Sequence, residues 1–460
     1  MFFVREKKFY KELFTMLAFV ALQNVVAYSV NMADNIMLGR YSQEALSGAA
    51  TVNQVFFIVQ QFAISFGNAL VAIAAQYWAQ GRAEPVKKLT GIAFKLGFVI
   101  SAALALVCLF IPEGIVRIFT SDPAIIEQGR DYLLLILWTF ILYILTNVLM
   151  AALRAVGTVR ISFYISIASL VINVGINYCL IFGKFGLPEM GIRGAAVGTM
   201  TARIVELLIV LIYLIFVDKK LKLFSKEDKG LDISWLTSGD KALRKDYFKI
   251  YFPIMCATVL WGISVPVQTA ILGRLSSDAI AANSVATTFY QYLKVIVVAM
   301  SSTSAVMTGQ SIGKGDIEHV KRVGRTLSVI DLGIGIVLGA LLAALRYPLL
   351  SLYNLNSTAY DMALDLILLM GLVMVGMSYQ MPVSFGIFQG GGDAKFTMTM
   401  NLISTWAIVI PLSFMAAFWW KLPIVWVVLV IQSDQIFKCL PVFIHFKKYT
   451  WIKKLTRDDA

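Results

Sequence analysis

The sequence predicts an all-α polytopic membrane protein, with twelve transmembrane helices in two parallel six-helix repeats and a central cavity between the two lobes. Three observations lead to this prediction. Of the 460 residues, 59% are hydrophobic and only 15% are charged, whereas about a quarter of the residues in a soluble protein are charged. Many mostly apolar runs exceed the roughly 18 residues that can span a bilayer. The third observation is an internal repeat.

The repeat is clearest in two segments that each lead from one apolar run to the next. Residues 31–40 read NMADNIMLGR, and residues 265–274, which lie 234 positions later, read VPVQTAILGR. A repeat of this length indicates duplication of a whole half of the chain, not a solenoid of short units. The two copies differ where the first carries Asp34 and the second carries Gln268. An acid placed in hydrocarbon usually marks a functional site.

Apolar length and charged flanks predict where the spans lie. The spans of the first half are expected at about 12–37, 47–77, 90–111, 130–153, 160–183 and 193–217, and those of the second at about 248–272, 281–309, 324–346, 361–388, 396–419 and 423–445. Every span should be helical, because unpaired backbone groups cannot face lipid. The expected domains are an N-terminal lobe (1–217), a cytoplasmic linker (218–247) and a C-terminal lobe with a short basic tail (248–460). Since each half has an even number of spans, the repeats should be parallel, with the substrate path between them.

The net charge is +13, and the distribution of the basic residues along the chain indicates the membrane topology. Basic residues cluster in the loops after even-numbered spans, as Arg82, Lys87 and Lys88 do after the second span. Cytoplasmic loops of membrane proteins carry such an excess of Lys and Arg. We therefore expect a multi-pass protein of the cell membrane with both termini in the cytoplasm, and no nucleic-acid partner.

Motifs for catalysis or metal binding are missing from the sequence. The four cysteines lie in apolar runs without a CxxC pair, and the two histidines have no metal-ligand partners at useful spacing. There is no G-x-x-x-x-G-K-[ST] loop, no H-E-x-x-H and no G-x-S-x-G. Because these motifs are absent, we expect neither an ATP-driven pump nor an enzyme. We also expect no cofactor, with an ion gradient as the source of energy.

Two motifs stand in their expected span or loop: N-x-x-D followed by L-G-R within 31–40, and L-R-A-x-G at 153–157. These motifs make the chain similar to the multidrug and toxic compound extrusion (MATE) family. The turn at 153–160 also has an echo in the second half, at 388–395. The resemblance covers nearly the whole chain. It implies a secondary transporter that exports organic, often cationic, compounds in exchange for inward protons or sodium, with no partners beyond substrate, ion and lipid. We expect a monomer.

Asp34 is the predicted coupling residue. Removal from water disfavours the charged form of a carboxyl group, so Asp34 could bind and release protons as water access changes. The resemblance places near this acid a pair four residues apart in the fifth span, here Asn173 and Asn177, and another in the sixth, here Ala195 and Thr199. The family pattern has a second acid where this chain has Asn177, so we favour protons over sodium. Ordinary hydrogen bonding between helices remains an alternative for these asparagines.

Polar or amphipathic residues within apolar spans are the candidates for substrate contact, and ordinary core packing is the alternative for each of them. They are Tyr28, Asn31, Asn147, Tyr379 and Gln380. The resemblance puts the cavity between the first, second, seventh and eighth spans.

Two charges in the second half are at compatible depths by residue count, and we expect Lys294 to pair with Asp331. One branch of the family has an acid where this chain has Trp261, so a sodium site there is not expected. The alternative function is a lipid or lipid-linked oligosaccharide flippase. Its polyanionic head groups would need several basic residues in the cavity, whereas most charges at membrane depth are acidic. A channel is disfavoured, because duplication around a single acid suits alternating access.

Overall fold

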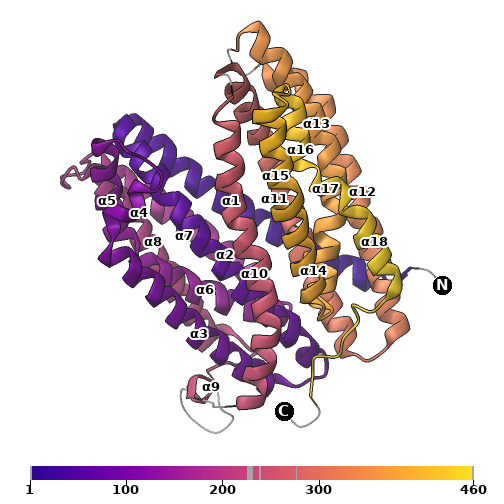
Figure 1. The fold of residues 1–460 in the computed structure, drawn as a ribbon. Helices are drawn as coiled ribbons and strands as arrows, with labels where there is room; N and C mark the ends of the chain where they lie inside the picture. The colour runs from indigo at the N-terminus through magenta and orange to yellow at the C-terminus, as the bar shows by residue number, and fades with distance from the viewer. Residues whose placement is uncertain are drawn as a thin grey trace. The chain divides into compact units, whose positions relative to one another are not determined.

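In the computed structural model, the described residues are 3–224, 232–237, 240–275, 277–351, 353 and 355–457. All of their regular structure is helical (Figure 1). The first half contains α1 (Lys7–Tyr41), α2 (Gln43–Ala79), α3 (Ala83–Phe110), α4 (Pro112–Arg117), α5 (Pro123–Ile136), α6 (Trp138–Ala155), α7 (Arg160–Ile181), α8 (Gly191–Ile212), the π-helical turn η1 (Tyr213–Val217) and α9 (Ser234–Thr237). The second half contains α10 (Lys241–Leu272), α11 (Ser277–Gly313), α12 (Ile317–Leu350), α13 (Ser357–Met381), η2 (Pro382–Phe388), α14 (Ala394–Asn401), η3 (Leu402–Val409), α15 (Ile410–Phe414), η4 (Met415–Trp419), α16 (Ile424–Gln432), α17 (Asp434–Phe437) and α18 (Cys439–Lys448).

Twelve helical segments of the described chain are long and apolar enough to cross a membrane, which confirms the predicted number. Each matches one predicted span, and several extend beyond the apolar run into polar sequence. The span predicted at 130–153 is interrupted at Leu137, where α5 ends and α6 begins. Part of the predicted linker, residues 225–231 and 238–239, lies outside the described residues.

The chain divides into two compact units, and the division falls inside two long helices. The N-terminal unit is Leu22–Tyr251, and the C-terminal unit combines Met1–Ala21 with Phe252–Asp458. The first part of α1 therefore belongs to the C-terminal unit, where the Val4 amide donates to the Thr326 hydroxyl at 3.1 Å. The first part of α10 likewise belongs to the N-terminal unit. The first span of each repeat thus begins in one unit and ends in the other.

In the N-terminal unit, small residues allow the helices to approach closely, as is usual between membrane helices. A Cβ on Gly48 of α2 would lie 2.9 Å from the backbone of Gly129 in α5. The described part of the linker also packs against this unit. Trp235 of α9 is buried, and its backbone carbonyl occupies the space where Gly91 of α3 would carry a Cβ. These close contacts hold α9 against α3.

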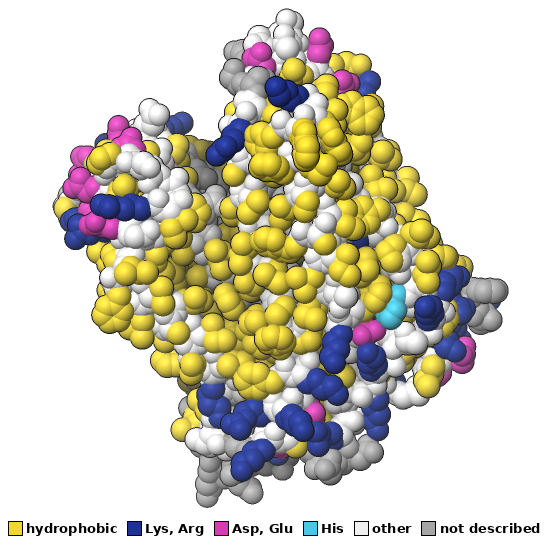
Figure 2. All heavy atoms as spheres, viewed as in Figure 1, with side chains coloured by type: hydrophobic (Ala, Val, Ile, Leu, Met, Phe, Trp, Pro, Cys, Tyr) yellow, Lys and Arg dark blue, Asp and Glu magenta, His cyan; other side chains and the backbone are white. Residues whose placement is uncertain are grey.

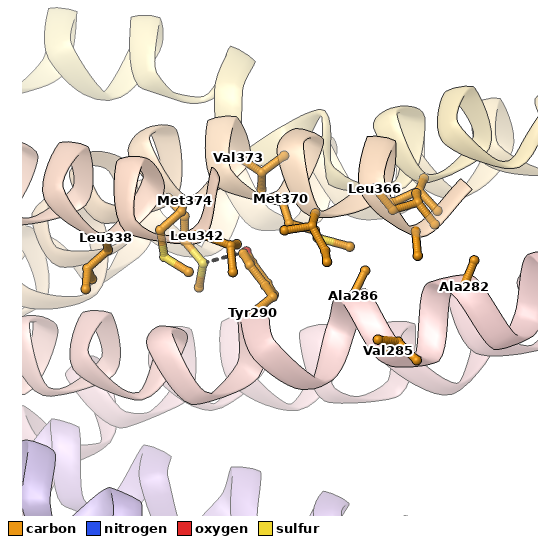
Figure 3. Close-up of a cluster of buried hydrophobic side chains, with 14 of the residues drawn as sticks. Ala282, Val285, Ala286, Tyr290, Leu338, Leu342, Leu366, Met370, Val373 and Met374 are labelled. Atoms are coloured by element: carbon orange, nitrogen blue, oxygen red, sulfur yellow. Dashed lines mark hydrogen bonds between the residues drawn. The ribbon is translucent and has the colours of Figure 1, made fainter. Parts of the chain in front are cut away.

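The core of the C-terminal unit lies between α11, α12, α13 and α16. Figure 3 shows Tyr290 of α11 extending toward the methionines of α13, and its hydroxyl lies 2.9 Å from the Met377 sulfur. On the other side of α13, Gly371 meets Gly339 of α12 so closely that a Cβ on either would strike the other's carbonyl group. Flexible methionines fill the irregular spaces of such a core.

The tail after α18 folds back onto the C-terminal unit. Trp451 is fully buried, and its indole Nε1 donates to the Phe446 carbonyl at 3.1 Å. Lys453 places its ammonium 2.8 Å from the Asp393 carboxylate. His445 contacts the other oxygen of the same carboxylate, also at 2.8 Å. The tail is therefore anchored by both packing and charge.

Figure 2 shows hydrophobic side chains over the long sides of α14, α15 and α16, with Lys and Arg gathered beyond the lower end of α14. The exposed side chains of this part of the chain include large apolar ones, such as Phe414, Trp426 and Phe443. A broad apolar surface of this kind suits contact with hydrocarbon and would be a liability in water.

Candidate functional site

The Asp34 carboxylate lies in α1 and contacts α7. Its Oδ1 accepts a hydrogen bond from the Asn177 side-chain amide at 2.6 Å. Asp34 is half-buried and Asn177 is fully buried. A hydrogen bond to an ionised group is stronger than one between neutral groups, so this contact fixes the position of the carboxylate.

A chain of polar contacts leads from Asn177 to α8. The Asn177 amide nitrogen lies 3.4 Å from the Asn173 carbonyl oxygen, one helical turn earlier on the same face of α7. The Asn173 amide in turn donates to the Thr199 hydroxyl at 3.2 Å. Tyr132 of α5, which is buried, also interacts with Thr199 and electrostatically with Asp34. The structure therefore brings together four of the five predicted coupling residues.

The fifth predicted coupling residue, Ala195, is buried one turn before Thr199 and offers only a methyl group. More informative is Gly198, whose Cα faces the Asn177 side chain so closely that a Cβ would overlap the Asn177 carbonyl oxygen. That oxygen is buried and has no hydrogen-bond partner among the described residues. The Asn177 side chain thus donates from its amide nitrogen to Asp34, while its carbonyl oxygen accepts no hydrogen bond from the described residues.

Two further charges belong to this site. Arg203 of α8 lies one turn after Thr199 and interacts electrostatically with Asp34. Its guanidinium donates to the Glu206 carboxylate at 2.7 Å and lies 4.8 Å from the centre of the Tyr143 ring. Arg203 and Glu206 were not among the coupling residues predicted from the sequence. Their spacing from Thr199 along a helix is the signal that would have found them.

The predicted substrate residues are scattered. Tyr28 and Asn31 are exposed on the part of α1 that belongs to the N-terminal unit. Asn147 donates its side-chain amide to the Tyr143 carbonyl of its own helix at 2.9 Å. In the C-terminal unit, Tyr379 is half-buried, whereas Gln380 is buried. Substrate contact by these five residues stays a prediction.

Gln380 belongs to a buried polar network. Its amide donates to Gln435 at 2.6 Å, and Gln435 donates to Asp434 at 2.9 Å. The other Asp434 oxygen lies 2.8 Å from the Lys438 ammonium, which also donates to Asn401 at 3.0 Å. Each charge of the Asp434–Lys438 pair therefore has a direct partner, as a buried ion pair requires.

This network occupies positions of the second half that correspond in sequence to positions of the N-terminal site. The dipeptide Leu187-Pro188 before α8 recurs as Leu422-Pro423 before α16, 235 positions later. At that separation, Lys438 corresponds to Arg203 and Asp434 corresponds to Thr199. Comparison of the two halves at this register could have identified the network from the sequence.

The predicted pairing of Lys294 with Asp331 is wrong. The buried Asp331 carboxylate accepts from Ser304 of α11 at 3.4 Å, and Ser304 is ten residues, or about 15 Å, along the helix from Lys294. Lys294 instead places its ammonium 4.9 Å from the centre of the Trp261 ring. Depth counted from predicted span ends did not give the register between α11 and α12.

A cavity of about 500 Å³ opens at the ends of α1 and α8 and beside α5. Its wall includes Tyr41, Glu189 and the ion pair between Arg193 and Asp131, whose closest atoms are 2.8 Å apart. Tyr41 lies seven residues, or about two turns, from Asp34 on α1. No cluster of His, Cys, Asp and Glu that could hold a metal ion occurs among the described residues.

Comparison with known proteins places these observations in a family. Residues 20–179 and 253–415, one stretch in each half, match the MatE family. The chain is 26% identical to a probable multidrug resistance protein NorM of Thermotoga maritima over 95% of this chain and 92% of the relative. It is 23% identical to the probable multidrug resistance protein YoeA of Bacillus subtilis, over 88% and 87% of the two chains.

Solved structures agree on the fold. The MATE transporter VcmN of Vibrio cholerae in its bent form superposes with a TM-score of 0.81 at 19% identity, covering 95% of this chain and 96% of that one. A transporter of the MOP superfamily from Pyrococcus furiosus gives 0.83 at 16% identity, covering 95% of both chains. With twelve helical spans, a duplicated half and the family match in both halves, this chain is a multi-pass membrane protein that belongs to the MATE family of transporters.

Proposed function

We propose that this protein is a secondary antiporter of the cell membrane, with both termini in the cytoplasm. It exports organic, amphipathic and mainly cationic compounds by alternating access, in exchange for inward protons carried by Asp34. The names of its relatives, multidrug resistance proteins, support the substrate class. The observation that carries the mechanism is the half-buried Asp34 carboxylate, hydrogen-bonded inside a membrane span.

Asn177 is suited to hold either protonation state of this carboxyl group. Its amide nitrogen donates to Asp34 in the ionised form. Its carbonyl oxygen, which has no partner among the described residues, is an acceptor that a protonated Asp34 can use after the amide rotates. A neighbour that offers both a donor and an acceptor can hydrogen-bond to the carboxyl group in either protonation state.

The charges around Asp34 favour protons over sodium. Sodium, like other hard cations, is bound through several oxygen ligands. Here Asp34 receives an N–H donor from Asn177 and interacts with the positively charged Arg203. A second cation would be repelled by that guanidinium, whereas a proton would neutralise the carboxylate in place.

The proposal is tested with membrane vesicles of known orientation, using ethidium as the exported dye. A proton or a sodium gradient is imposed on wild type, Asp34→Asn and a matched control, Asp365→Asn, whose side chain is also in a span but exposed. We expect the proton gradient alone to drive export, Asp34→Asn to abolish it and the control to keep it.

Other outcomes would change the proposal in distinct ways. Export driven by sodium alone would overturn the proton assignment. If neither gradient moved the dye in folded protein, multidrug export itself would fail, and movement of labelled lipids would then test the flippase alternative.

A further inference from the structure

Lys294 carries a positive charge that no side chain of the described structure neutralises directly. It lies midway along α11, inside a segment long and apolar enough to span the membrane. Its ammonium lies 4.9 Å from the centre of the Trp261 ring, and it forms no ion pair with any described carboxylate. Charged groups inside membrane spans are costly and normally have partners.

The carboxylate that acts on Lys294 electrostatically is Asp434, and it is already occupied. One Asp434 oxygen lies 2.8 Å from the Lys438 ammonium, and the other accepts from Gln435 at 2.9 Å. Two ammonium groups therefore share one carboxylate. Asp331 cannot supply the missing charge, because its contact on α11 lies about 15 Å along the helix.

The Trp261 ring satisfies only part of what Lys294 needs. An aromatic face attracts a cation. An ammonium, however, has three N–H donors, and the ring has no lone pair that accepts a hydrogen bond from them. Both side chains are half-buried, so each remains partly accessible. Lys294 and Trp261 together thus present an unused cationic donor beside an aromatic surface.

We propose that Lys294 and Trp261 form a subsite for an aromatic carboxylate carried by the transported compound. The carboxylate would accept from the Lys294 ammonium, and the adjoining ring would pack against Trp261. This inference rests on the proposed export function and adds to its cationic substrates those compounds that combine an aromatic system with an anionic group, zwitterions included.

Two dyes that differ in a single group provide the test. Rhodamine 110 has a free carboxylate, and rhodamine 123 is its methyl ester with the same fluorophore. Binding to the purified full-length protein in detergent is measured by fluorescence anisotropy. We expect Lys294→Met to weaken rhodamine 110 binding by about tenfold or more, the usual effect of losing a hydrogen bond between charged groups. Binding of rhodamine 123 should change less than twofold.

Three further variants separate charge from packing. Lys294→Arg keeps the charge and should keep the preference for rhodamine 110. Trp261→Leu removes the ring and should weaken both dyes. Lys395→Met removes an exposed lysine of the same unit and should change neither. Melting temperatures in detergent show that each variant is folded.

The outcomes distinguish this inference from the function on which it rests. If Lys294→Met changed the binding of both dyes equally, or if the wild type exported rhodamine 123 but did not bind rhodamine 110, the subsite would be refuted and the export function would stand. If folded wild-type protein bound and exported neither dye, the subsite and the multidrug export function would both be wrong.

Discussion

Replacement of Gly198 by alanine should uncouple transport. A Cβ at this position would overlap the Asn177 carbonyl oxygen and lie 3.0 Å from the adjacent Asn177 carbon. The Asn177 side chain is fully buried and closely packed, so it can make room only by turning away. Such a movement breaks the 2.6 Å hydrogen bond from Asn177 to Asp34.

The size of the effect follows from that hydrogen bond. A hydrogen bond to a charged group contributes about 1.5–3 kcal/mol, which corresponds to a factor of about 10 to 150 in an equilibrium. Overpacking adds about 1–3 kcal/mol of destabilisation, and the better helix propensity of alanine offsets about 1 kcal/mol of it. Together with the lost hydrogen bond, these effects should lower folding stability by about 1.5–5 kcal/mol, while proton-driven export falls at least tenfold.

Gly175 provides a matched control on the same helix as Asn177. A Cβ added to Gly175 meets nothing within 4 Å, so Gly175→Ala should be neutral or slightly stabilising. Initial rates of ethidium export under a proton gradient are compared for wild type and both variants, with melting temperatures measured on the same preparations. Wild-type export by Gly198→Ala would refute the role assigned to the Asn177–Asp34 contact, as would an equal loss in both variants.

Two further changes test the C-terminal unit. Lys438→Met leaves the buried Asp434 carboxylate without its ion-pair partner and should destabilise the protein by about 3–5 kcal/mol. Adding Asp434→Leu should restore most of the melting temperature. Additive losses in the double variant would argue against a direct pair. Trp451→Ala removes a fully buried side chain and should lower folding stability by about 3–5 kcal/mol, seen as a lower melting temperature. The control Trp419→Ala, at a residue that is 76% exposed, should have little effect. A similar loss of stability in both variants would contradict the anchoring of the tail.

The sequence predicted the number and positions of the spans because apolar length is a property of each segment alone. Asp34 was identified for the same kind of reason, as an acid within an apolar run. Its partners Asn173, Asn177 and Thr199 came from resemblance to a family, since one sequence does not show which helix faces contact each other. The structure supports that arrangement with direct hydrogen bonds.

The predictions that failed or were missed depend on contacts between helices. Pairing Lys294 with Asp331 required the register of two antiparallel helices, and this register shifts when helices extend beyond their apolar runs, as α11 and α12 do. The break at Leu137 has no glycine or proline to mark it. The environment of Gly198 depends on a neighbouring helix 21 residues earlier in the chain, and a glycine in an apolar helix gives no hint of that neighbour.

The two helices that pass from one compact unit to the other differ in mechanical stiffness. In α10 the boundary between units falls at Phe252, next to Pro253. A proline inside a helix removes one backbone hydrogen bond and weakens resistance to bending. In α1 the boundary falls at Leu22, and the helix contains no proline. Bending of α10 should therefore be easiest near Pro253, whereas α1, which carries Asp34, has no such weak point along its length.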